Sequence, residues 1–270
     1  MATITPPATL VPAAGATAPA PEADHESLPR RMSLQHELFG AWCALIFTVL
    51  TIVGFLGLSR FYHPVAGNVP DRVLAGFYAS HRFGVELGMS IFALATVFLA
   101  IYTIELSIAL WRREGTTPLF AIGQLLGGFA VVMLIFISCC LWIGAAYRAG
   151  QAGSDVTAAL NDTSWFGFLV GWVMLSLQMA CAGVIVIRSH AHSRHPLAPR
   201  WVGWATILGA IVLATANGCA FTKGGTFGWN GVLGYYLPMA IWGVWLDGMA
   251  FLLRADVKRR IAAAETQYRA

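Results

Sequence analysis

The sequence predicts an all-α fold, a polytopic membrane helical bundle of six transmembrane helices with short interfacial helices on its outer side. Of the 270 residues, 57% are hydrophobic and only 11% are charged, whereas a soluble domain carries about 25% charged residues. The apolar residues also fall into runs of about 20, the length of helix that crosses a hydrocarbon core. These observations predict an integral membrane protein that contacts the lipid bilayer.

The chain is expected to divide into three parts. Residues 1–34 are rich in Ala, Pro and Thr and contain no apolar run that could bury a core, so we expect a disordered N-terminal tail. A transmembrane domain follows over residues 35–255, and a basic C-terminal tail covers residues 256–270. The six expected spans cover residues 39–58, 84–110, 119–146, 163–187, 201–220 and 233–253.

The lysines and arginines predict the orientation of the bundle. Twelve of the 17 lie near the two termini and in the loops after the second and fourth spans, and five lie in the three other loops. Because cytoplasmic loops carry the excess of Lys and Arg, both termini are expected in the cytoplasm. The segments 59–83, 147–162 and 221–232 are then expected on the outer side of the membrane.

The first two outer segments each contain signals that start a helix. Pro70 suits the first turn of a helix, and Asp71 favours the positive end of its dipole. The apolar face of residues 70–80 therefore predicts a short helix lying in the outer interface. Ser154 predicts a second short helix that ends near residue 161, with a cap for the fourth span at Asp162 or the next residue. We expect the outer side to be ordered.

A layer of polar and aromatic residues is expected on this outer side as a binding surface. Lys223 lies among glycines, and its ammonium group together with backbone N–H groups can hold an anion such as a carboxylate or a lipid headgroup. Alternatively, Lys223 pairs with Asp162 or Glu86, and the aromatic residues form an ordinary interface belt. The members of the layer are His63, His81, Glu86, Asp162, Asn217, Lys223, Trp229, Asn230, Tyr235 and Tyr236.

Two acidic residues lie within the apolar spans. Glu105 precedes Arg112 by seven residues, and Asp247 precedes Arg254 by seven residues, which places each carboxyl about 10 Å along its helix from the basic boundary. Ionisable groups at this depth are costly and often functional. If the second and sixth spans touch, Glu105 and Asp247 can share one proton or bind a cation. Alternatively, each carboxyl is hydrogen-bonded to a neighbouring helix.

No pattern in the sequence predicts a catalytic, metal or cofactor site. The seven histidines lie outside the apolar centres of the spans, so bis-histidine haem ligation is not expected. Nucleophile, phosphate-loop and dinucleotide motifs are absent from the sequence. The positive net charge is concentrated in a few loops and the C-terminal tail. In a membrane protein this distribution indicates topology first, so no nucleic-acid partner is expected.

Four segments together resemble a family of uncharacterised polytopic membrane proteins of the actinobacterial type. They are GFYASHRFGVELGM from Gly76, ALNDTSW from Ala159, PRWVGW from Pro199 and FTKGGTFGWNG from Phe221. The resemblance implies the polytopic fold and the bacterial cytoplasmic (inner) membrane. It brings no activity, substrate or cofactor.

Three functions from different classes are compatible with these features. The first is an accessory or scaffold subunit, or a lipid-interacting one, that binds a protein partner or a small hydrophobic or anionic ligand through the outer side. The second is a small-molecule or ion transporter that uses Glu105 and Asp247. The third is a membrane enzyme acting on a lipid-soluble substrate, which is the least favoured because no nucleophile or cofactor motif supports it.

Overall fold

The computed structural model describes residues 23–192 and 196–269, and all of the regular elements in these ranges are helices. Helices long and apolar enough to cross a membrane occur six times in this part of the chain. The elements are α1 (Ala23–Thr51), the π-helical η1 (Ile52–Leu58), α2 (Asp71–Ser80), α3 (Arg82–Glu114), α4 (Leu119–Arg148), α5 (Ser154–Val170), α6 (Trp172–His192), α7 (Arg200–Leu213), the 3-10 helical η2 (Ala214–Ala220), the π-helical η3 (Val232–Tyr236) and α8 (Leu237–Arg269).

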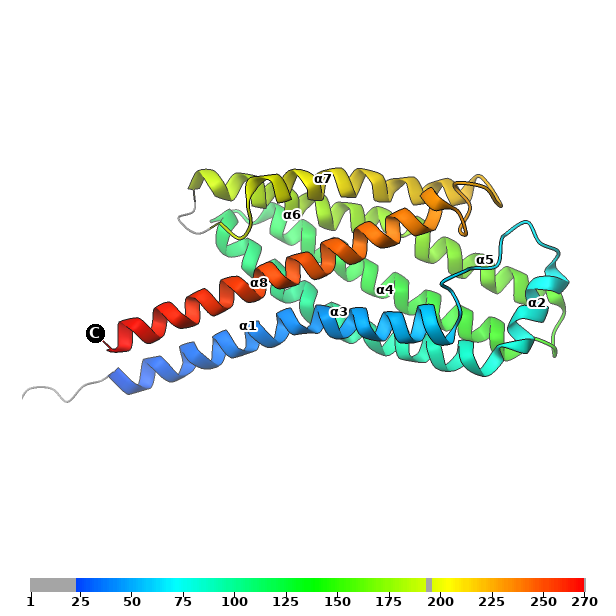
Figure 1. Cartoon of the computed structure of the whole chain (residues 1–270), viewed down its shortest axis with the longest axis horizontal. Coiled ribbons are helices and arrows are strands. Elements are labelled where there is room, and N and C mark those ends of the chain that lie inside the picture. Colours follow the sequence, from blue (N-terminus) through cyan, green and yellow to red (C-terminus); the bar gives the residue numbers. More distant parts are fainter. Residues whose placement is uncertain (1–22, 193–195, 270) are drawn as a thin grey trace, which may run out of the picture.

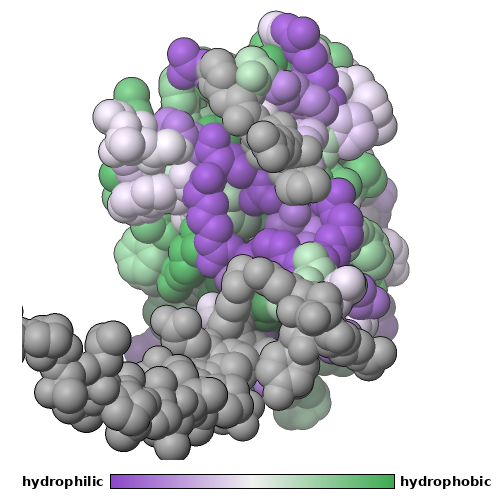
Figure 2. All heavy atoms as spheres, turned by 90° about the vertical axis from the view of Figure 1, so that its left-hand side faces the viewer, coloured by the Kyte–Doolittle hydropathy of each residue, from purple (hydrophilic) through white to green (hydrophobic). Residues whose placement is uncertain are grey.

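The long helices run lengthwise beside one another and form an elongated bundle with two distinct ends (Figure 1). We call the end at which α1 begins and α8 finishes the terminal end, and the opposite end, with α2 and the loop 221–231, the cap end. Figure 2 looks onto the terminal end, where hydrophilic residues gather over the middle and hydrophobic residues show at the flanks. This distribution suits a bundle whose sides face lipid and whose ends face water.

The structure confirms the six expected spans and lengthens most of them. The spans are Ser33–Leu58, Arg82–Glu114, Leu119–Arg148, Ser154–Ala191, Arg200–Ala220 and Val232–Thr266. Helix α1 begins at Ala23, so residues 23–34 are helical where the sequence predicts a disordered tail, while residues 1–22 lie outside the described part of the chain. Helix α8 likewise continues through the basic segment from residue 256 to Arg269.

The cap end contains one separate short helix rather than two. Helix α2 matches the expected interfacial helix over residues 70–80. The second short helix is not separate, because α5 continues through residue 161 and ends at Val170. The predicted cap was therefore wrong: the Thr163 hydroxyl donates to the carbonyl of Ala159 one turn earlier, at 2.8 Å, and the buried Asn161 packs this face of α5 into the bundle.

The π-helical η1, which continues α1, crosses α3 closely because glycine lies at their contact. A Cβ added to Gly88 would meet the carbonyl oxygen of Gly54 and the hydroxyl of Ser59, so neither helix could keep its position with a larger residue there. The Ser59 hydroxyl donates to the Gly54 carbonyl at 3.0 Å, which satisfies a backbone acceptor of η1. The close crossing sets α1 along the face of α3 that carries Glu105.

Aromatic side chains fill the half of the bundle next to the cap. The ring of Phe55 lies 5.7 Å from Trp142 and 5.3 Å from Phe168, between ring centroids. Trp142 and Trp165 meet edge to face at 5.0 Å. These rings are almost fully buried, so the cap half is a packed core, and the buried ion pairs lie in the terminal half instead.

Candidate functional site

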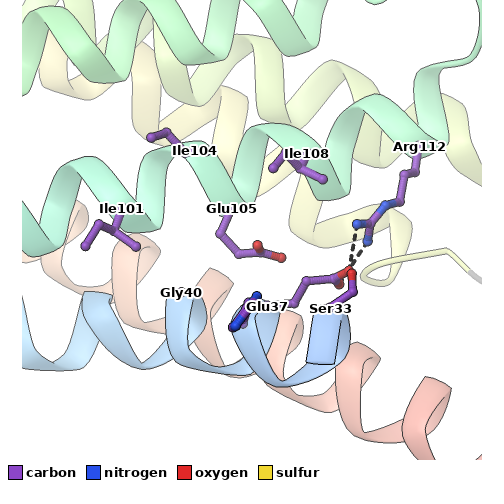
Figure 3. A pocket seen from close by; sticks show the side chains of 9 residues that line it. Ser33, Glu37, Gly40, Ile101, Ile104, Glu105, Ile108 and Arg112 are labelled. Atoms are coloured by element: carbon purple, nitrogen blue, oxygen red, sulfur yellow. Dashed lines mark hydrogen bonds and ion pairs between the residues drawn. The ribbon is translucent and has the colours of Figure 1, made fainter. Parts of the chain in front are cut away.

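The candidate site is a cleft between α1 and α3 near the terminal end (Figure 3). Its volume is about 550 Å³. Glu105 projects from α3 into the space between the two helices, toward Gly40 and Glu37 on α1. The lining residues are Ser33, His36, Glu37, Gly40, Ile101, Ile104, Glu105, Ile108 and Arg112.

Glu105 is buried without a charge partner. The residue is 7% exposed, and its Oε1 atom has no hydrogen-bond partner in the described part of the chain. Glycine at position 40 makes room for it, since a Cβ there would lie 2.8 Å from the Glu105 Cβ and 2.9 Å from its Cγ. An isolated carboxylate is costly to remove from water unless it is paired. This carboxyl therefore favours occupancy by a proton or a cation.

Both oxygens of the neighbouring carboxylate, Glu37, bind arginine side chains. Arg112 donates to its two oxygens at 2.7 and 2.9 Å, which is the bidentate geometry that Arg uses with carboxylates. Arg260 from α8 also pairs with Glu37 Oε2. Glu37 thus joins α1 to α3 and α8, and in the described structure Arg112 forms its ion pair with Glu37 and not with Glu105.

A second group of ion pairs, next to that of Glu37, connects α3 with α8. Asp256 receives Arg113 at 2.8 Å, the Nε of Arg260 at 3.2 Å and Arg259 at 3.5 Å. Because Arg260 contacts both Asp256 and Glu37, the two groups form one network across three helices. The network fixes the helices that form the walls of the cleft.

The other acid that the sequence singles out, Asp247 on α8, packs against a different part of α1. Its Oδ1 accepts a hydrogen bond from the Thr48 hydroxyl at 2.9 Å. Glu105 packs at Gly40 and Asp247 at Thr48, eight residues apart on α1, which is a rise of about 12 Å along the helix. No ion pair or hydrogen bond joins the two carboxyls among the described residues. The structure therefore does not bring this expected pair together.

The charged residues predicted for the outer layer are not paired as expected. Lys223 is exposed and forms no ion pair within 4 Å in the described ranges. Glu86 pairs instead with Arg82 one turn earlier, at 2.8 Å. Asp162 accepts a hydrogen bond from the Asn161 amide at 3.0 Å. His81, at the start of α3, approaches the carbonyl of Phe77 at 2.9 Å.

The aromatic residues of this layer mainly hold the cap together. The Trp229 indole donates to the carbonyl of Val65 at 2.8 Å, and the Tyr235 hydroxyl donates to the carbonyl of Phe61 at 2.6 Å. Both side chains are buried. They anchor the segment 59–69 rather than offer a free surface.

Four further polar members lie around these anchors. His63 Nδ1 lies 3.2 Å from the hydroxyl of Tyr236. The Asn217 amide donates to the carbonyl of Ala214 at 3.1 Å, and the side-chain oxygen of Asn230 is buried without a partner in the described structure. The layer is therefore spread over several local contacts, and it does not converge on one site.

Buried hydrogen bonds tie α2 to α5 beneath the cap. The Tyr78 hydroxyl donates to Asn161 Oδ1 at 2.8 Å, and the Trp165 indole donates to the same oxygen at 3.2 Å. Burial raises the pKa of the Tyr78 hydroxyl well above its usual value, and the charge of Asp162 raises this pKa further. The hydroxyl therefore stays protonated and remains a donor.

Sequence reasoning missed Glu37 and Gly40, which line the candidate site, and Asp256, which belongs to the ion-pair network beside it. Each lies close to a boundary of a predicted span, where charged and small residues are ordinary. A usable signal was present: Glu37 and Asp256 are acids placed at the level of the basic boundary marked by Arg112 and Arg113. Acids at that level predict ion pairs between helix ends.

Comparisons of the chain with protein-family models, with curated proteins and with solved structures each give no match. The resemblance to the actinobacterial-type family therefore stays a prediction.

Proposed function

We propose that this chain is a small-molecule- or ion-handling membrane protein that binds a proton or a cation at Glu105, in the cleft between α1 and α3. One observation carries the proposal: the Glu105 carboxyl is buried, lines the cleft and has no charge partner. Ionisable groups in this setting are costly to maintain, and they mark proton and ion sites in membrane proteins.

Two acids at the same end of the bundle provide a comparison within the molecule. Glu37 and Asp256 are also buried, and each is neutralised by arginines from a neighbouring helix. A carboxyl whose purpose is to hold helices together has such partners. Glu105 lies among these arginines and pairs with none of them, which supports a role in binding rather than in packing.

The location of the site in the membrane belongs to the same proposal. The excess of Lys and Arg near the termini supports a cytoplasmic terminal end, so the cleft would open toward the inner leaflet of a bacterial cytoplasmic membrane. The bound species would then enter from the cytoplasm or from that leaflet.

The proposal is tested with dicyclohexylcarbodiimide, a membrane-soluble reagent that adds a protonated carboxyl group across its C=N bond and leaves a stable N-acylurea. We expect mass spectrometry of the protein in lipid nanodiscs to find this adduct at Glu105. The adduct should decrease as the pH rises, because the reagent needs the protonated carboxyl, and it should be absent in Glu105→Gln. Glu37, which holds two arginines, is the control and should stay unmodified. No adduct at Glu105 at any pH would refute the proposal.

The cap end supports a second candidate function, binding of a protein partner or a hydrophobic or anionic ligand. Phe221 is 89% exposed, and the unpaired Lys223 is also exposed, in an ordered loop that Trp229 anchors. An exposed aromatic side chain beside a free ammonium group suits an accessory or scaffold subunit. Crosslinking in native membranes should capture a partner with the wild type and not with Phe221→Ser. Equal yields from both proteins would count against this function.

A further inference from the structure

We infer that the cleft takes a lipophilic primary amine, with its ammonium group on Glu105 and its hydrocarbon chain along the isoleucines of α3. The inference rests on the proposed function, because it assumes that Glu105 binds a cation. It adds the chemical class of the bound molecule.

The ion pairs around the cleft leave one carboxyl, Glu105, that a positive charge can pair with. Among the lining residues, Glu37 and Glu105 are acidic and Arg112 is basic, and Arg112 is bound through both of its terminal nitrogens to Glu37. One negative charge, on Glu105, is left without a partner. A monocation entering the cleft can form an ion pair with this carboxyl, whereas the terminal N–H groups of Arg112 that an anion would need already bind Glu37.

A divalent metal ion fits this cleft poorly. Calcium takes six to eight oxygen ligands, and magnesium takes six in a strict octahedron. In the ranges that the structure describes, no group of three or more His, Cys, Asp or Glu side chains is placed to hold a metal ion. One uncommitted carboxyl suits an organic cation, which needs only one counter-charge.

The wall of the cleft that α3 forms is apolar. Ile101, Ile104 and Ile108 follow one another at helical spacing on α3, and Ile104 is 51% exposed. Glu105 lies about 10 Å along α3 from Arg112 at the boundary, and Ile101 and Ile104 lie on the far side of it. A chain bound there would run parallel to the lipid chains of the same leaflet.

A primary amine matches the hydrogen bonding better than a quaternary one. The Glu105 Oε1 atom is buried without a donor, and a buried acceptor left unpaired costs about 1–3 kcal/mol. An ammonium group brings three N–H donors as well as its charge. A trimethylammonium group brings the charge alone, so it should bind more weakly.

The inference is tested by protection of Glu105 from dicyclohexylcarbodiimide in phosphatidylcholine nanodiscs. Three probes of equal chain length are compared: dodecylamine, dodecyltrimethylammonium and dodecanol. We expect dodecylamine to lower the rate of Glu105 modification at least tenfold, counting the N-acylurea and any amide with the amine together. Dodecyltrimethylammonium should protect less, and dodecanol should not protect.

The outcomes separate the two proposals. Modification of Glu105 without protection by dodecylamine refutes the amine and leaves the proposed function standing. Equal protection by dodecanol also refutes it, because charge would then be irrelevant. If Glu105 is never modified, the proposed function itself fails.

A matched pair of variants tests the apolar wall separately. Ile104→Ala shortens a side chain that lines the cleft, and Leu94→Ala shortens one that is 59% exposed on the same helix outside it. Neither change removes a buried contact of the core. Protection by dodecylamine should weaken about fourfold in Ile104→Ala, because the bound chain loses contact equivalent to about one buried methylene, ~0.8 kcal/mol, and it should not change in Leu94→Ala. Equal effects in both variants would show that the chain does not lie on this wall.

Discussion

At the scale of single residues, the carboxyl groups of the terminal half differ in the hydrogen-bond and ion-pair donors that they receive. Glu37 and Asp256 receive arginine N–H groups. Asp247 receives only the hydroxyl of Thr48, and Glu105 receives no donor at its buried oxygen in the described structure. Because a buried charge is tolerated when it is paired, the first two acids are structural. Neither Asp247 nor Glu105 has an ion pair in the described structure, and of the two only Glu105 has a buried oxygen without a hydrogen-bond partner.

The structural role of Glu37 predicts a stability change in Glu37→Gln. The amide removes the charge that Arg112 and Arg260 share. Breaking a buried ion pair costs 3–5 kcal/mol, but both arginines are about a third or more exposed, so we expect a loss of about 1–3 kcal/mol. Thermal unfolding in detergent, followed by tryptophan fluorescence, measures it. Glu265→Gln, at an exposed position of α8, is the control and should unfold like the wild type.

The sequence identifies Glu105 because a carboxyl inside an apolar span is unusual, whatever surrounds it. It does not identify the neighbour of Glu105, since that depends on which face of α1 meets α3. The spacing to Arg112 and Arg254 predicts similar depths for Glu105 and Asp247, and the two carboxyls nevertheless pack at different levels of α1. Depth follows from counting residues, whereas contact also needs the rotation of each helix.

At the scale of the elements, some helix boundaries follow from local sequence signals, and others follow from tertiary contacts. Pro70 and Asp71 start α2 by their own chemistry, and the structure confirms that helix. Ser154 starts α5 in the same way. The end expected near residue 161 is missing because Tyr78 and Trp165 both donate to Asn161 and bury it within the helix. The sequence shows that asparagine is unfavourable inside a helix. It does not show the hydrogen-bond partners that keep Asn161 within α5.

The anchoring of the cap predicts the effect of Trp229→Phe. A smaller phenyl ring replaces the indole, and the hydrogen bond to the Val65 carbonyl is lost; the lost hydrogen bond by itself costs about 1 kcal/mol. Local opening of residues 59–69 should therefore become about fivefold more frequent, measured by hydrogen–deuterium exchange. Trp204→Phe, at an exposed position on α7, should leave this segment unchanged. Unaltered exchange in Trp229→Phe would mean that the indole N–H does not hold the loop.

At the scale of the whole molecule, the two halves of the bundle are built from different interactions. The cap half is packed with rings such as Phe55, Trp142 and Trp165. The terminal half is held by the network of Glu37 and Asp256, with the cleft beside it. Rings pack into a rigid, dry core, while a cleft bordered by ion pairs can exchange small species with water or lipid. Binding is therefore expected from the terminal end.

Which leaflet that end faces is predicted by the distribution of Lys and Arg, and impermeant maleimide labelling of intact cells tests it. Phe221→Cys places a thiol at the cap end, and Ala262→Cys places one on the exposed part of α8. We expect Phe221→Cys to be labelled in intact cells and Ala262→Cys only after permeabilisation. The wild type is the control, since its cysteines are buried, apart from Cys140 on the apolar flank of α4. Reversed labelling would place the cleft in the outer leaflet, and an amine would then reach Glu105 from outside the cell.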